Sequence, residues 1–122
     1  MSIQLQIEEM PDYLTVKFTG AGAAEEIWRL YELMAEHCKR ANKNKLLVDF
    51  TEAYVEASLT DRYTLGEQAQ IFARYKLIKV AAVVRPDRVD PEGFGEMVAR
   101  NRGVNGRAFT NVGDAVEWLL KE

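Results

Sequence analysis

The last third of the sequence constrains the fold most, because apolar strands and well-marked helices alternate there. Residues 77–84 form a mainly apolar run of strand length, and residues 107–110 are predicted as a shorter strand. Between them, Asp90 is a predicted N-cap, Pro91 suits the first helical position, and Gly103 suits a left-handed C-cap. A strand–helix–strand order needs a crossover connection, which places the two strands parallel in one sheet. This third of the chain therefore predicts a parallel α/β fold.

A final helix follows the strand predicted at residues 107–110. Asn111 is a predicted N-cap, and Asp114 stands at the third helical position, where a carboxylate is favoured by the helix N-terminus. Apolar residues then recur at helical spacing, with Trp118 at the margin of their stripe: Val112, Ala115, Val116 and Leu119. This stripe predicts that the last helix packs against the sheet.

The chain begins with a predicted hairpin. Residues 3–7 and 13–18 alternate apolar and polar side chains, as strands with one wet face do, and a turn containing Pro11 separates them. Residues 19–22 are predicted to end the second strand, since glycine occurs there twice. Residues 23–42 then predict a helix, because one stripe of apolar residues recurs at helical spacing: Ile27, Tyr31, Met34, Cys38 and Ala41.

The middle of the chain adds a strand and a helix. Residues 46–50 form a nearly continuous apolar run, typical of an interior strand covered on both faces. A second helix is predicted over residues 59–75, with Ser58 as its N-cap and Asp61 completing a capping box. The order ββαβαβαβα predicts one α/β domain over residues 1–122: a two-layer sandwich with a five-stranded mixed sheet, four helices and an antiparallel first strand at the edge.

The composition excludes several classes of partner and location. The net charge of −3 provides no basic excess for phosphates, so we expect no nucleic-acid partner. Cys38 is the only cysteine, which rules out a disulfide within the chain and fits a reducing compartment. The apolar runs are too short to span a bilayer, and no leader pattern is present. We therefore expect a cytoplasmic protein without an integral membrane segment, bacterial by default.

Three parts of the chain carry a resemblance to a known family: the strand Val48-Asp49-Phe50, the helix that begins near Ser58, and the closing F-T-x-x-x-x-A-x-x-W-L pattern from Phe109. With these parts the chain resembles SpoIIAA-like proteins of the STAS superfamily, which includes the anti-sigma-factor antagonists. The resemblance implies a small α/β sandwich that serves as a regulatory or protein-interaction module. It also implies a phosphorylatable serine at the start of the helix after the Asp-containing strand.

Ser58 and Thr60 are the nearest equivalents of that phospho-acceptor. A helix N-terminus favours a phosphate, because its free N–H groups and its dipole point toward it. The family has an Asp-Ser pair followed by Ser or Thr and Gly, whereas residues 56–61 here read E-A-S-L-T-D, so the phospho-serine motif is missing. The alternative interpretation is that Ser58 caps the helix and has no regulatory role.

An anion site is predicted where the parallel strands end. Asp49 closes an interior strand, and ligands of open α/β sheets bind at the carboxyl edge. Arg62, Arg85 and Arg88 are placed to gather there as anion ligands, with Asp49 orienting them. In the alternative interpretation, Asp49 accepts hydrogen bonds from loop N–H groups and the arginines are solvated.

A contact surface is predicted around the second helix. Tyr54, Val55 and Tyr63 combine large apolar area with polar tips, as interface residues often do. If Tyr54 and Val55 lie on a surface loop, this face is a candidate for homodimerisation or for docking a regulatory protein partner. If they cover the sheet edge instead, they belong to the ordinary core.

The sequence contains no recognisable catalytic constellation. His37 is the only histidine, and Gly20-Ala21-Gly22 lacks the third glycine of a dinucleotide fingerprint. We expect that the chain is not an enzyme and binds neither a metal nor a cofactor. We expect instead a non-catalytic regulatory or protein-interaction module. The alternative is a binder of a small apolar ligand or lipid, suggested by similarity of the SpoIIAA-like branch to Sec14-type lipid-transfer folds. A pocket below roughly 300 Å³ would exclude that alternative.

Overall fold

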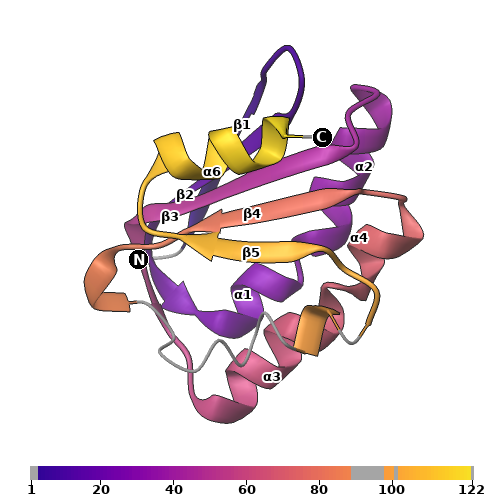
Figure 1. Cartoon of the computed structure of the whole chain (residues 1–122). Helices are drawn as coiled ribbons and strands as arrows, with labels where there is room; N and C mark the ends of the chain where they lie inside the picture. The colour runs from indigo at the N-terminus through magenta and orange to yellow at the C-terminus, as the bar shows by residue number, and fades with distance from the viewer. Residues whose placement is uncertain (1–2, 89–97, 101, 122) are drawn as a thin grey trace.

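The structure is a computed structural model that describes residues 3–88, 98–100 and 102–121. Its centre is a five-stranded sheet in the order β1-β2-β3-β4-β5 (Figure 1). The strands are β1 (Gln4–Glu9), β2 (Leu14–Ala23), β3 (Lys45–Glu56), β4 (Lys79–Val83) and β5 (Gly106–Phe109). Only β1 runs antiparallel to its neighbour, and it lies at an edge. The predicted mixed α/β sheet is therefore confirmed, including the parallel pairing of the 46–50 strand with the next one, in which Leu46 lies opposite Val80.

Helices connect the parallel strands and follow the last of them. Between the strands lie α1 (Ala24–Trp28), α2 (Tyr31–Arg40), α3 (Leu59–Gln68) and α4 (Gln70–Arg74), with a short 3₁₀ helix, η1 (Pro86–Arg88), after β4, and α6 (Val112–Leu120) follows β5. The helices predicted at 23–42 and 59–75 are each divided into two, at Arg29–Leu30 and at Ala69. Most of the helix predicted from Pro91 to Gly103 lies outside the described residues.

The two faces of the sheet are covered by different helices (Figure 1). Side chains that alternate along β2 and β3, such as Phe18, Leu46 and Val48, are buried against α1, α2 and α4. The neighbouring positions point the other way, so Leu47 packs with Leu119 of α6. This alternation is the two-residue period of a strand. Of the described helices, α6 thus packs on the face opposite α1, α2 and α4.

The predicted end of the second strand at residues 19–22 is wrong, because β2 continues through Ala23. Thr19 pairs with Glu52 and Gly20 with Ala53, after a register shift beyond Lys17. Pairing with β3 therefore outweighs the poor strand propensity of glycine. For the same reason β3 runs on to Glu56, well beyond the strand predicted at 46–50.

Candidate functional site

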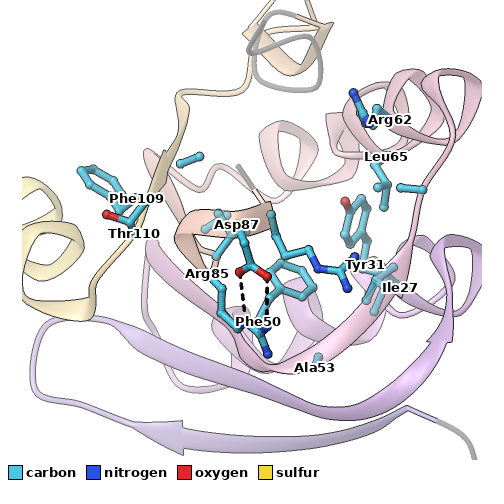
Figure 2. Close-up of a pocket in the computed structure, with 16 residues that line it drawn as sticks. Ile27, Tyr31, Phe50, Ala53, Arg62, Leu65, Arg85, Asp87, Phe109 and Thr110 are labelled. Carbon is cyan, nitrogen blue, oxygen red and sulfur yellow. Dashed lines mark hydrogen bonds and ion pairs between the residues drawn. The ribbon is translucent and has the colours of Figure 1, made fainter. Parts of the chain in front are cut away.

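A pocket of about 550 Å³ lies where the parallel strands β3, β4 and β5 end (Figure 2). This is the carboxyl edge at which ligands of open α/β sheets bind. Its walls come from the ends of these strands, from α1, α2 and α3, and from η1. The lining residues are Ile27, Tyr31, Phe50, Ala53, Val55, Ala57, Arg62, Leu65, Ala82, Val84, Arg85, Asp87, Arg88, Ala108, Phe109 and Thr110.

Small side chains create this hollow. On the face of the sheet that α1, α2 and α4 cover, Val48, Ala82 and Ala108 lie opposite one another on β3, β4 and β5. Two of these three positions carry only a methyl group, and Ala53 adds another on β3. Larger side chains such as Phe50 and Leu65 stand around them and form apolar walls. The pocket is therefore deep, because alanines occupy strand positions that usually carry larger residues.

A second hollow of about 150 Å³ adjoins the first. Tyr31, Phe50, Leu65, Ala82 and Ala108 line both. The further lining of the second hollow is mainly apolar: Val48, Gly66, Ala69, Phe72, Val80, Ala99, Val104 and Arg107. Together the two hollows form one apolar space, which extends along the sheet from its carboxyl edge.

One ion pair stands at the wall of the larger pocket. The Nε of Arg85 lies 3.2 Å from Oδ1 of Asp87, and Nη2 lies 3.1 Å from Oδ2, so both carboxylate oxygens accept from one guanidinium (Figure 2). This contact holds the pKa of Asp87 below its ordinary value and raises the pKa of Arg85. Both groups remain charged at neutral pH.

The other two predicted anion ligands line the same pocket. Arg62 reaches it from the first half of α3 and is half-buried. Arg88 comes from η1, and its guanidinium carbon lies 3.7 Å from the centre of the Tyr54 ring. The structure therefore brings Arg62 of α3 together with Arg85 and Arg88 of the segment after β4 at one pocket, and anion binding there stays a prediction.

Asp49 is not among the residues that line the pocket. It lies on the same face of β3 as Leu47, because two residues along a strand is one full period. Its Oδ1 accepts hydrogen bonds from the N–H of Thr51 at 2.8 Å and from the Thr51 hydroxyl at 2.7 Å. The predicted role of Asp49 as orienter of the arginines is thus not supported, and the alternative of a backbone-binding carboxylate describes its contacts.

Ser58 caps α3. Its hydroxyl oxygen accepts from the N–H of Asp61 at 3.1 Å, and the Asp61 carboxylate accepts from the N–H of Ser58 at 3.0 Å. This is the predicted capping box. Thr60 is exposed in the first turn. Phosphorylation of Ser58 or Thr60 stays a prediction.

The three candidate interface residues do not share one surface. Tyr54 and Val55 belong to β3 and not to a loop, so they face opposite sides of the sheet. Tyr54 is 46% exposed, whereas Val55 lines the pocket. Tyr63 on α3 is 39% exposed, and its hydroxyl accepts from Nη2 of Arg102 at 3.0 Å. An interface can therefore include Tyr54 or Tyr63, but Val55 belongs to the pocket.

Other chemistry is sparse in the described residues. They include no group of three or more histidine, cysteine, aspartate or glutamate side chains that could hold a metal ion. Within the same part of the chain, no helix is long and apolar enough to cross a membrane. Cys38 is fully buried, and burial raises the pKa of its thiol to about 12. A thiol of this kind is a poor nucleophile at neutral pH.

Two solved structures resemble the whole chain. One is an uncharacterised protein of the DUF3478 family with a SpoIIAA-like fold from Shewanella loihica PV-4, with a TM-score of 0.53 and 22% identity over 96% of this chain and 93% of that chain. The other is an anti-sigma factor antagonist from Mycobacterium paratuberculosis, with a TM-score of 0.62 and 13% identity over 98% of this chain and 96% of that chain. The chain thus has the SpoIIAA-like fold that its sequence predicted. No family model and no curated protein matches the sequence.

Proposed function

We propose that this chain is a non-catalytic binding protein that takes a small, mostly apolar ligand in the pocket at the carboxyl edge. The observation that supports it is the pocket volume of about 550 Å³. This is above the roughly 300 Å³ at which ligand pockets of proteins begin. The proposal places the protein in the cytoplasm, where a lone thiol such as Cys38 stays reduced.

The lining suggests how a ligand would be held. Apolar side chains such as Ile27, Phe50 and Leu65 offer contact area, and burial of apolar surface is the main source of affinity for such a ligand. The arginines stand among the lining residues and add polar contacts. Such a combination of apolar walls and a few polar groups is usual in ligand pockets, where the polar groups fix the orientation.

A pocket-filling substitution tests this function. Ala82→Leu places three more carbon atoms on the pocket floor, between Val48 and Ala108. Titration with the uncharged fluorescent probe Nile red should show binding to the unchanged chain. The variant should bind about tenfold or more weakly, because overpacking costs about 1–3 kcal/mol. The matched control is Ala21→Leu, at an exposed position of β2, which should leave the affinity unchanged. Absence of Nile red binding, or equal binding by both variants, would remove the proposal.

The regulatory interaction module is the second candidate function. Leu59 and Tyr63 are 58% and 39% exposed on α3, and large exposed apolar side chains mark interaction surfaces when they occur together. Similarity in fold to an anti-sigma factor antagonist also favours a protein partner. Light scattering at tens of micromolar tests the homodimer form. A dimer that Leu59→Ser dissociates would support it, whereas a strict monomer would remove the dimer.

A further inference from the structure

The Arg85–Asp87 pair already has the geometry of a bound carboxylate. Two nitrogens of one guanidinium meet the two oxygens of Asp87, at 3.2 and 3.1 Å. Such a fork is the preferred arrangement for an arginine that binds a carboxylate. Both residues line the larger pocket, so this carboxylate occupies a position at the pocket wall.

We propose that the pocket takes an amphipathic carboxylate whose charged end replaces Asp87 on Arg85. The apolar part of the ligand then lies against Phe50, Leu65 and the alanine floor. This inference rests on the proposed function and names the chemical class of its ligand. In this proposal, the carboxylate of Asp87 competes with the ligand carboxylate for Arg85. It holds the Arg85 side chain in place while no ligand is bound.

The exchange is feasible because the internal pair is exposed. The side chains of Arg85 and Asp87 are 51% and 61% exposed, and ion pairs in water contribute little to stability. A ligand carboxylate therefore replaces a weak contact, while its apolar part adds contacts that Asp87 does not make. Once displaced, Asp87 can be hydrated at the surface.

The charges around the pocket favour an incoming anion. Three arginines, Arg62, Arg85 and Arg88, are among the described lining residues, whereas Asp87 is the only carboxylate among them. The positive potential of such a site attracts an anion more strongly than its direct contact partner alone would. The positive charges of Arg62 and Arg88 add to that of Arg85 and balance a second carboxylate in the pocket.

Two probes with the same apolar part separate this inference from the proposed function. Decanoate carries a carboxylate, and 1-decanol carries none. Calorimetric titration of the full chain should show tighter binding of decanoate than of 1-decanol. Arg85→Gln should remove this preference, so that decanoate and 1-decanol bind the variant equally, and because the arginine is half-exposed its loss does not disturb the core.

Asp87→Asn tests the competition directly. It should tighten decanoate binding about two- to fivefold, because the contact to be broken is worth no more than an exposed ion pair. The ratio of decanoate affinity to 1-decanol affinity should rise by the same factor. The control Asp12→Asn removes the same charge from the exposed turn before β2, at the opposite end of the strands, and should change neither affinity.

The outcomes are distinguishable. If 1-decanol and decanoate bind equally to the unchanged chain, the carboxylate class is wrong and the apolar binding function stands. If Asp87→Asn binds decanoate no more tightly than Asp12→Asn does, Asp87 is no competitor and the exchange is overturned. If neither probe binds, the inference and the proposed function fall together.

Discussion

The guanidinium of Arg88 stacks on the ring of Tyr54, with 3.7 Å between the guanidinium carbon and the ring centre. This contact joins η1, which follows β4, to the C-terminal end of strand β3. The contact lies beside the Arg85–Asp87 pair, because Asp87 directly precedes Arg88 in η1 and Arg85 directly precedes that short helix. The aromatic ring on the strand thus supports the loop that carries two pocket arginines.

Removal of the Tyr54 ring should loosen this loop. Tyr54→Ala should lower the free energy of unfolding by about 1 kcal/mol, since a cation over an aromatic ring contributes about 0.5–1 kcal/mol at exposed sites. Urea unfolding measures the change. Tyr54→Phe keeps the ring and should retain most of the stability. An alanine variant as stable as the phenylalanine variant would contradict a supporting role for the stack.

Loss of the capping hydroxyl should destabilise α3. Ser58→Ala leaves the N–H of Asp61 without its side-chain acceptor, so the free energy of unfolding should fall by about 1 kcal/mol. Ser58→Asn restores an acceptor at the N-cap and should recover most of it. Thr60→Ala, in the same exposed turn, should have a much smaller effect on the unfolding midpoint. Equal losses at both positions would show that the cap is not the cause.

Cys38 should react with thiol reagents only after unfolding. Burial raises its thiol pKa from 9.0 to about 12, which lowers the thiolate population on the order of a thousandfold. Labelling with a chromogenic disulfide should therefore be slow in buffer and rapid in denaturant. Fast labelling of the folded chain would mean that the thiol is accessible.

The same burial makes stability depend on alkaline pH. Because the folded pKa lies above the unfolded value, the folded state keeps its proton between about pH 9 and pH 12, and stability falls as pH rises through that window. Cys38→Ala should be less stable at neutral pH, because it leaves a cavity, but its stability should decline less steeply with pH. Burial also raises the pKa of Tyr31, so some decline should remain. Urea midpoints at several pH values test this difference in slope.

Substitution by alanine should lower the stability of the chain at Gly22 and raise it at Gly113. A Cβ on Gly22 would collide with the Glu26 carboxylate and lie 2.7 Å from Cγ1 of Ile3. That carboxylate accepts the N–H of Ala23 at 2.8 Å, so Gly22→Ala should cost about 1–3 kcal/mol. At Gly113, in α6, the nearest atom would be Oδ1 of Asn111 at 3.4 Å, so Gly113→Ala should stabilise by about 0.5–1 kcal/mol. Thermal unfolding midpoints that move the same way would contradict this contrast.

Much of the fold could be predicted from the spacing of apolar residues, because that spacing follows which faces are buried. The alternation in residues 13–18 and the apolar run at 46–50 identify two neighbouring strands. The extension of β2 through Gly20 and Gly22 could not be predicted in this way. It depends on pairing with residues 52–56 of β3, and a partner distant in sequence leaves no local periodic signal.

The candidate site was predictable in part. The rule that ligands bind where parallel strands end correctly grouped Arg62, Arg85 and Arg88 around one pocket. The same rule misplaced Asp49, since it does not say which face of the strand a side chain takes. The hollow itself was missed. Ala82 and Ala108 lie in strands of ordinary composition, and only their alignment across the sheet makes the space.

This alignment of alanines has a consequence for how such a chain can diverge. The depth of the pocket is set by side chains at two facing strand positions, while the backbone hydrogen bonds around them are independent of residue type. Exchanging either methyl for a larger or smaller group would change the volume of the pocket without moving the strands. Chains that share this backbone need not share the size of this pocket.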